Sequence, residues 1–478
     1  MSGPAPTHAL ELPEILLRIS QFLPLWSAGD RGSYIFEPQT LLACTLVSKS
    51  FRQAMLPTLW YMFDHSFMRN LPESIMFKYS PHFRILGLNY PVSVTLPTTS
   101  TSTATTTTTP LRSLSCTWLI DLRIYGNEPS CRDLLHVNPQ LQKILWAGTT
   151  EYSDDSIPVV EPNLLKGLTD LRWLRLCEWD LGREGALLPM LQAVQNTLTV
   201  LRLDSFCGGE GVLPDPLPAT AENSPFLAPD HGISDGSPSP WLRIKELTMD
   251  LQFTLSHQLI DLVAFCPLLE DLTLIAACDA DLNRLVQNLE HCPNLSRIQV
   301  DGIYFGLFDT YRILRDSKFA SLIRCCNRVP QSLSRSLSPF GENVDIEERG
   351  SSSGSGNGKS AKRGGLKSFR ADVHGLEPLF TQALIEAGPS LQSLHLTIHR
   401  MQHDETDIDT DDDEDDRGIV RSRYDIKRDQ LQLYRILEAC PNLEKVQLEF
   451  EDPVFSNSTI FTVDPRWQSI VKVVNNGV

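Results

Sequence analysis

One pattern, Leu-x-x-Leu-x-Leu, recurs along most of this 478-residue chain and constrains its fold more than any other feature. Nine copies are clear and two are weaker, with an apolar residue at each of the three positions. The clear copies begin at Leu119, Leu141, Leu171, Leu198, Ile244, Leu269, Leu295, Leu391 and Leu443, and the weaker ones begin at Phe83 and Leu366. Several successive starts lie 25 or 26 residues apart, as from 244 to 269 and from 269 to 295. A fixed period of this length indicates a repeat architecture.

An amphipathic helix is predicted before several copies of the pattern. Apolar residues at i, i+3, i+4 and i+7, which mark one face of a helix, occur in four such segments. These segments span 259–266, 282–289, 380–387 and 433–440. Each one ends at a proline, in CPLL, CPNL, GPSL and CPNL. Because proline cannot extend a helix, the chain should turn there into the next strand.

A unit of one short strand and one helix cannot bury its apolar side alone, so neighbouring units should stack around a continuous core. The sequence therefore predicts an α/β solenoid of the horseshoe type, with a parallel β-sheet on the concave face and helices outside. The units resemble the cysteine-containing leucine-rich repeats over roughly residues 80–450. We expect a repeat domain spanning 66–478.

Four stretches have compositions unsuited to a packed core, and we expect them to be disordered insertions. The stretch near 97–110 is rich in Thr and Ser, and the stretch near 208–240 is rich in Pro. The stretch near 330–365 is rich in Gly and Ser, and the stretch near 402–420 is rich in acidic residues. The number of repeats between Val300 and Leu366 stays open, because one strand could be hidden there.

The first 65 residues predict three short helices. The first has one apolar face and is opened by Pro13, the second begins at Thr40, and the third is capped by Ser48 and ended by Pro57. Three short helices enclose little core, which predicts that a partner helps to bury them.

The segments LPEILLRISQFL and LLACTLVSKSFRQAMLPTLW resemble the F-box over about residues 10–60. Phe51 stands where the family usually has Trp, and 24–39 form a longer connection than most members have. The resemblance implies an adaptor-binding domain at 1–65 that docks on the Skp-type adaptor of a cullin-RING (SCF) ubiquitin ligase. The residues implied in adaptor binding are Leu12, Pro13, Glu14, Ile15, Leu16, Ile19, Leu42, Val47 and Phe51.

An F-box followed by leucine-rich repeats implies a non-catalytic substrate receptor in ubiquitin-dependent protein degradation, linked through the adaptor to a cullin. No cofactor and no enzymatic activity are expected. Two alternatives remain open. The chain could be a leucine-rich repeat scaffold acting outside a ubiquitin ligase, or the helices could be a cap that shields the first repeat from solvent.

Substrate contacts are expected on the concave face, where the side chains between the apolar strand positions point. Arg123, Arg175 and Arg202 would form a cationic ladder beside Tyr125 and Trp173, suited to an acidic or phosphorylated segment. An alternative remains equally open. The three arginines could instead be neutralised by neighbouring carboxylates, Asp121, Asp204 and Asp250.

Charge and composition set the expected compartment and partners. The net charge is −17, with ten acidic residues within 404–416, which argues against a nucleic-acid partner. No apolar run is long enough to span a membrane and no signal segment opens the chain, so no membrane partner is expected. Eleven scattered cysteines are typical of a protein of the cytoplasm or the nucleus, where thiols are kept reduced. Cys266, Cys292 and Cys440 should be buried, and the histidines at 395, 399 and 403 are not expected to bind metal.

Overall fold

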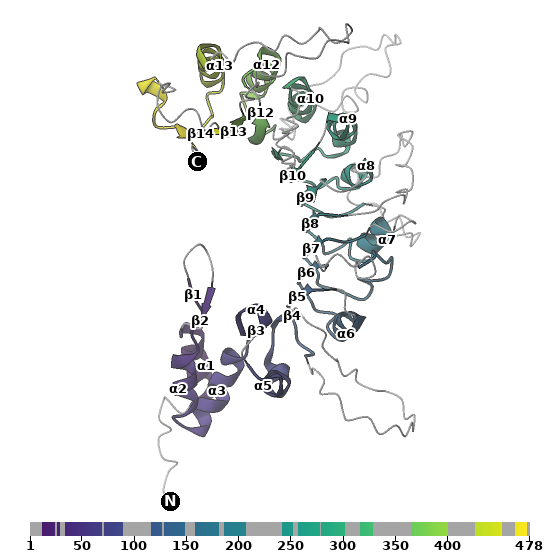
Figure 1. Ribbon diagram of the computed structural model, residues 1–478, viewed down its shortest axis with the longest axis vertical. Coiled ribbons are helices and arrows are strands. Elements are labelled where there is room, and N and C mark those ends of the chain that lie inside the picture. The colour runs from purple at the N-terminus through teal and green to yellow at the C-terminus, as the bar shows by residue number, and fades with distance from the viewer. Residues whose placement is uncertain are drawn as a thin grey trace, which may run out of the picture. The chain divides into compact units, whose positions relative to one another are not determined.

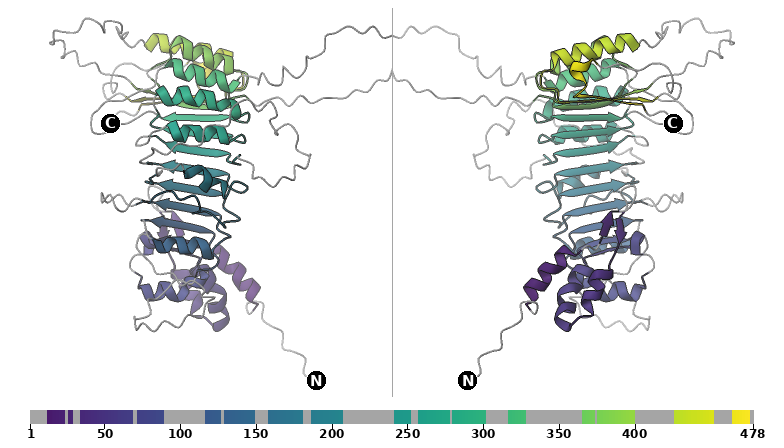
Figure 2. Two further views of the ribbon diagram at one scale, coloured as in Figure 1. Left: turned by 90° about the vertical axis from the view of Figure 1, so that its right-hand side faces the viewer. Right: turned by 90° about the vertical axis from the view of Figure 1, so that its left-hand side faces the viewer.

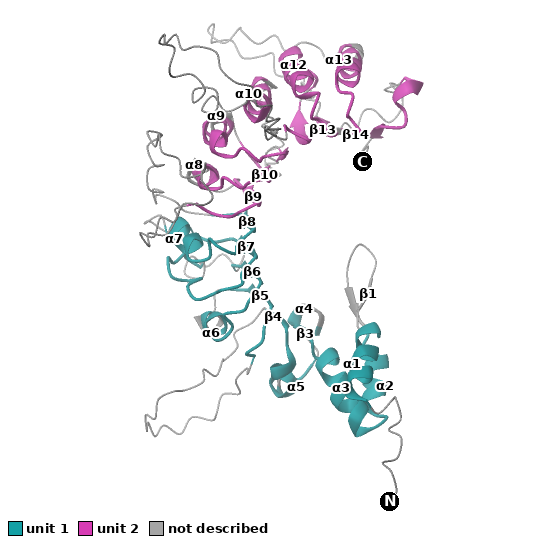
Figure 3. Ribbon diagram, turned by 180° about the vertical axis from the view of Figure 1, so that it is seen from behind, with its two compact units in different colours: residues 1–212 teal, residues 213–478 magenta. Residues whose placement is uncertain are grey.

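The computed structural model describes this chain in ranges separated by gaps. These ranges are 12–23, 26–28, 34–68, 71–88, 116–126, 129–148, 158–180, 186–206, 241–251, 257–277, 279–301, 316–327, 365–373, 375–399, 426–451 and 464–475. The predicted insertions near 97–110, 208–240, 330–365 and 402–420 lie outside them, except for Gly365. The chain forms two compact units, residues 1–212 and 213–478 (Figure 3).

The first unit begins with a module of three helices, as the sequence predicts. These are α1 (Pro13–Phe22), α2 (Gln39–Thr45) and α3 (Lys49–Leu59). Leu16, Leu41 and Met55 are fully buried in this module. The hydroxyl groups of Ser20 on α1 and Thr58 on α3 lie 2.6 Å apart and share a hydrogen bond. The module therefore has a small core and one polar tie.

The predicted start of the third helix is confirmed, because the backbone N–H of Phe51 donates to the side chain of Ser48 (3.2 Å). Its predicted end at Pro57 is wrong, since α3 continues to Leu59. Leu59 and Trp60 are buried, and we attribute the continuation to this packing, which outweighs the N–H that proline lacks. The indole of Trp60 also stacks on the ring of Tyr79, with centroids 4.5 Å apart.

The long connection predicted at 24–39 contains a hairpin that the sequence did not predict. Its strands are β1 (Trp26–Ala28) and β2 (Tyr34–Phe36), which pair antiparallel.

The remainder of the first unit is a parallel sheet whose strands follow chain order. Its strands are β3 (Met62–Asp64), β4 (Ile85–Leu88), β5 (Asp121–Tyr125), β6 (Lys143–Ala147), β7 (Trp173–Cys177) and β8 (Val200–Asp204). Its helices are α4 (His65–Met68), α5 (Glu73–Tyr79), α6 (Pro129–Val137) and α7 (Leu187–Gln192).

The second unit has the same plan, with parallel strands in chain order. Its strands are β9 (Glu246–Asp250), β10 (Asp271–Ile275), β11 (Arg297–Asp301), β12 (Ser368–Val373), β13 (Ser393–His399), β14 (Lys445–Glu451) and β15 (Val471–Asn475). Its helices are α8 (His257–Leu262), α9 (Asp279–Asn288), α10 (Asp316–Asn327), α12 (Pro378–Ala387) and α13 (Ile426–Ala439). Because β11 pairs directly with β12, the segment between Val300 and Leu366 inserts no strand between these two strands of the sheet.

The predicted α/β class with a parallel sheet is confirmed. Every copy of the pattern runs into a strand, and its last two apolar positions point into the core, as Leu122 and Ile124 do on β5. In each unit, helices lie along one face of the strands (Figures 1 and 2). The pattern did not reveal β3 or β15, which lack the full set of apolar residues.

The entry to each strand shows why the register is so regular. The backbone N–H groups of Glu270 and Asp271 both donate to the carbonyl of Lys245, at 2.8 and 2.9 Å. One repeat later, the N–H groups of Ser296 and Arg297 both donate to the carbonyl of Glu270, at 3.0 Å each. The same paired donation recurs along both units and holds each strand in step with the one before it.

The residue before each helix-ending proline is buried. Cys266, Cys292 and Cys440 are buried, as predicted, and the sulfur of Cys292 lies 3.4 Å from the carbonyl oxygens of Val263 and Cys266 in the preceding repeat. Gly388 occupies the same position in its repeat. A Cβ there would lie 2.7 Å from the carbonyl oxygen of Ala439, so this repeat has no room for a side chain.

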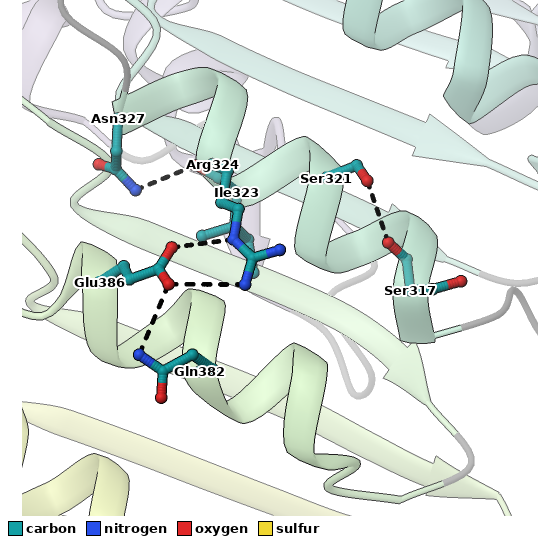
Figure 4. Close-up of polar contacts among 7 residues, drawn as sticks. All are labelled: Ser317, Ser321, Ile323, Arg324, Asn327, Gln382 and Glu386. Carbon is teal, nitrogen blue, oxygen red and sulfur yellow. Dashed lines mark hydrogen bonds and ion pairs between the residues drawn. The ribbon is translucent and has the colours of Figure 1, made fainter.

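Neighbouring helices of the second unit also exchange polar contacts at the surface. Arg324 on α10 donates from Nε to Glu386 on α12 at 2.9 Å, and Gln382 donates to the same carboxylate at 3.5 Å (Figure 4). Both ionic side chains are partly solvent-exposed, so this pair contributes little to stability.

A buried asparagine gives the sharpest stability test of this repeat geometry. The amide of Asn138 donates to the carbonyls of Cys116 and Leu134 and accepts from the N–H of Leu119, all at 2.9 Å. Asn138→Ala leaves three buried backbone groups unpaired, and we expect it to lower the free energy of unfolding by about 3 kcal/mol.

Urea denaturation of the full-length protein, followed by circular dichroism, measures this loss. Asn442→Ala is the matched control, because the amide of Asn442 donates to one carbonyl, that of Pro389 (2.7 Å), in an exposed position. It should cost about 1 kcal/mol or less. Equal losses for the two variants would contradict the assigned role of Asn138.

Candidate protein-interaction surfaces

The first helix exposes apolar side chains beside its buried face. Leu16 has no exposed surface, whereas Leu12, Ile15 and Phe22 are exposed. At 3.6 residues per turn these three lie along one side of α1, next to the core-facing stripe. Leu17, also exposed, lies about 200° round the helix from Ile15. The apolar side of α1 is thus wider than the module can cover.

The second helix and the turn after it continue this exposure. Leu42, Leu46 and Val47 are exposed, Val47 at 65% and Leu46 at 83% of their full surface. Single exposed apolar residues are ordinary, but a group of them on one small module indicates an interaction surface. We call this group the helical apolar surface, and it comprises Leu12, Ile15, Phe22, Leu42, Leu46 and Val47.

The structure places the predicted adaptor-binding residues in three different environments. Exposed positions are Leu12, Pro13, Glu14, Ile15, Leu42 and Val47. Ile19 and Phe51 are half-buried. Leu16 is a correction, because its side chain is fully enclosed by the module and offers no surface to a partner. Its apolar character serves the core of the three helices instead.

The second candidate surface is the face of the first unit's sheet that is opposite its helices. Strand register aligns Arg123, Leu145, Arg175 and Arg202 in one row across β5, β6, β7 and β8. The row predicted from the sequence therefore exists, with Leu145 separating the first two arginines. Asp64 and Gly87 extend it across β3 and β4.

Arg123 is held by two carboxylates. Its Nη2 lies 3.1 Å from Oδ2 of Asp121, and its Nη1 lies 3.8 Å from Oδ2 of Asp64. Asp64 is two strands away, and the row position between them is Gly87. A Cβ at Gly87 would lie 2.6 Å from Oδ2 of Asp64, so this ion pair depends on the missing side chain.

Arg175 is also paired. Its Nε donates to Oδ2 of Asp204 at 2.5 Å, and the sulfur of Cys177 lies 3.4 Å from the same oxygen. Burial, with the negative charge of Asp204, raises the pKa of Cys177 to about 12. This cysteine is therefore a thiol near neutral pH, and not a nucleophilic thiolate.

Arg202 differs from the other two arginines. It is exposed, and the guanidinium carbon lies 6.0 Å from the ring centroid of Trp173. Asp204 and Asp121, two of the three acids predicted to neutralise the arginines, pair with Arg175 and Arg123. The third, Asp250, lies on β9 of the other unit. Tyr125, the remaining predicted contact, is exposed at the end of β5.

Lys143 belongs to this surface but was missed by sequence reasoning. It lies in register with Trp173, and its Nζ is 4.7 Å from the centroid of that ring. From the sequence, cations were sought only at the middle position of each strand, although Trp173 was named at a first position. Lys143 is two residues before Leu145, on the same face. Searching the first position of each strand for cations would have found it.

The corresponding face of the second unit carries a polar row made of Thr248, Thr273, Gln299, Arg370, His395 and Gln447. Nε2 of His395 lies 3.0 Å from Oε1 of Glu449, and Nε of Arg370 lies 3.7 Å from Oδ1 of Asp301. Burial, together with the charge of Arg370, lowers the pKa of His395. His395 lies on a strand, as predicted. The other two histidines of its series cannot be assessed, since neither the side chain of His399 nor any part of His403 is described.

In the described ranges, no group of three His, Cys, Asp or Glu side chains is arranged to hold a metal ion. None of the helices in those ranges is long and apolar enough to cross a membrane.

The thiol of Cys177 provides a chemical test of the Arg175–Asp204 geometry. Asp204→Asn removes a negative charge next to the sulfur, which lowers the pKa of Cys177 and raises its thiolate fraction. We expect alkylation of Cys177 by iodoacetamide at pH 8 to accelerate by about threefold or more. Peptide mapping by mass spectrometry measures the rate, with Cys44 on α2 as the internal control. An unchanged Cys177 rate would contradict the contact.

Comparison of the chain with models of known protein families finds no match, and no curated protein matches it.

Proposed function

We propose that this chain is the non-catalytic substrate receptor of an SCF-type ubiquitin ligase. Its helical module binds a Skp-type adaptor, and its strand face binds a protein substrate. The observation that carries the proposal is the helical apolar surface, left exposed on a small module that directly precedes a parallel repeat sheet. The resemblance of the same residues to the F-box motif supports it.

The energetics of the module favour a bound partner. Its own core is small, as expected for about fifty residues. Fully burying an exposed Leu, Ile, Phe or Val contributes about 1.5–3 kcal/mol, so covering the six residues of the helical apolar surface offers a large driving force for association. Association also costs translational, rotational and side-chain entropy, which offsets part of this free energy.

A receptor of this kind works by tethering. The adaptor would hold the chain in the ligase while the strand face holds the substrate, so that the ubiquitin-carrying subunit meets its target at high effective concentration. Neither contact requires chemistry by the receptor itself. On the strand face, Lys143 and Arg202 lie over the ring of Trp173. This combination of an aromatic ring and two cations suits contact with a substrate protein.

The test is adaptor binding by variants that alter only exposed side chains. Ile15→Asp puts a charge into the centre of the proposed contact, and we expect it to weaken binding by about thirtyfold or more, equivalent to about 2 kcal/mol. Leu17→Asp is the matched control. It lies on the same helix and is similarly exposed, at 42% against 38% for Ile15, but faces the other side. It should leave the affinity nearly unchanged.

Calorimetric titration of purified full-length protein with a recombinant Skp-type adaptor measures these affinities, and circular dichroism checks that the variants fold. Leu16 is unsuitable for this test because its replacement would disturb the core. Equal weakening by Ile15→Asp and Leu17→Asp would contradict the assigned surface. No binding by the unaltered protein would favour the alternative, a leucine-rich repeat scaffold outside a ubiquitin ligase.

A further inference from the structure

A tryptophan flanked by two cations is the most distinctive feature of the first unit's strand face. Trp173 on β7 is half-buried, with Nζ of Lys143 4.7 Å and the guanidinium carbon of Arg202 6.0 Å from its ring centroid. Lys143 comes from β6 and Arg202 from β8, the strands on either side of β7. We call these three residues the cation–tryptophan site.

The two cations are the unpaired ones on this face. Arg123 is committed to Asp121 and Asp64, and Arg175 to Asp204. Within the described part of the chain, neither Lys143 nor Arg202 has a carboxylate at ion-pair distance. A cation resting on an aromatic ring keeps outward N–H donors available for an anion.

We propose that the cation–tryptophan site binds a carboxylate-rich segment of a partner protein, with one carboxylate at Lys143 and another at Arg202. The proposal rests on the receptor function and deepens it by naming the class of substrate. Charge complementarity is the basis: both cations are exposed, and their side chains converge on one ring.

Strand geometry sets the spacing of the carboxylates. Lys143 lies in register with Val200, two residues before Arg202, so the two cations are offset along the strands as well as across them. Because neighbouring strands lie about 4.8 Å apart and a strand advances about 3.3 Å per residue, the two residues are separated by roughly 11–12 Å. In an extended peptide only residues an even number apart face the same side, and four residues span about 13 Å. The expected feature in the partner is therefore a pair of acids at i and i+4 in an extended segment.

A nucleic acid fits this face less well than an acidic peptide. A phosphate backbone presents continuous negative charge and needs an array of cations. Here Arg123 and Arg175 are already paired with Asp64, Asp121 and Asp204, so they offer no such array. Two unpaired cations suit a short segment with two carboxylates.

Fluorescence anisotropy with purified full-length protein tests the proposal. The probe is a fluorescein-labelled Gly/Ser peptide with Glu at i and i+4, and its Gln counterpart is the neutral control. We expect the Glu peptide to bind at least about tenfold more tightly than the Gln peptide, and its binding to weaken as salt is raised. Lys143→Glu and Arg202→Glu should each weaken binding by about fivefold or more.

Lys166→Glu is the matched control variant, since Lys166 is exposed, lies in the turn at 162–167 and undergoes the same change of charge. It should change the affinity by less than about twofold. Equal weakening by Lys166→Glu would show a general charge effect and overturn the site, as would binding of the Gln peptide with the affinity of the Glu peptide. Circular dichroism confirms that each variant is folded.

Two further probes test whether the site prefers carboxylates to phosphates. A phosphoserine peptide without Glu and a single-stranded oligonucleotide should both bind more weakly than the Glu peptide, and tighter binding of either would overturn the proposal. The adaptor is absent from these measurements, so their failure leaves the adaptor proposal standing. Equally, loss of adaptor binding says nothing against the peptide site.

Discussion

Mutual burial of the inward-facing strand residues is the interaction on which the rest of this structure depends. Each repeat presents two or three apolar side chains from its strand, such as Leu174 and Leu176 of β7, and these are fully buried. A single repeat cannot exclude water from them, because it has one strand and one short helix. Stacking solves this problem for the interior repeats. It also aligns the strands in register, and thereby aligns the polar residues between them into rows.

Those rows explain how a regular fold acquires a specific surface. The apolar positions must repeat, but the positions between them point to the other face and are free to vary. On the first unit this freedom creates two self-neutralised arginines and one ring between two unpaired cations. At the start of the chain a different situation holds, because the helical module exposes Ile15, Leu42 and Val47 without a neighbouring repeat to cover them. One surface is therefore apolar and the other charged, which suits two partners of different chemistry.

Much of this fold is predictable from the sequence. The apolar core residues recur once per repeat, and within each strand they alternate with residues of the opposite face. The repeat pattern alone assigns Leu122 and Ile124 to the core and Cys266 to a buried helix end, and all three are buried. Strands without the pattern were missed. The strands β3 and β15 are held by backbone pairing with one neighbour each, and β1 and β2 lie in a segment with no repeat signal.

The candidate site was predictable only in part, because ion pairs depend on contacts between strands. The partner of Arg123 across Gly87 is Asp64, on a strand that the pattern did not mark. Which arginines are neutralised could not be decided without that geometry. Leu16 was misassigned for a related reason: helical spacing places it on the apolar side of α1 but does not say which part of that side the module itself covers.

The proposed receptor function requires one chain to hold two different partners at once, through separate surfaces. Sedimentation velocity of the full-length protein, mixed with a Skp-type adaptor and the labelled Glu peptide, measures whether it does. We expect a ternary complex in which the peptide label sediments with the receptor and the adaptor together. Displacement of the peptide by the adaptor, or failure of the adaptor to sediment with the chain, would contradict it.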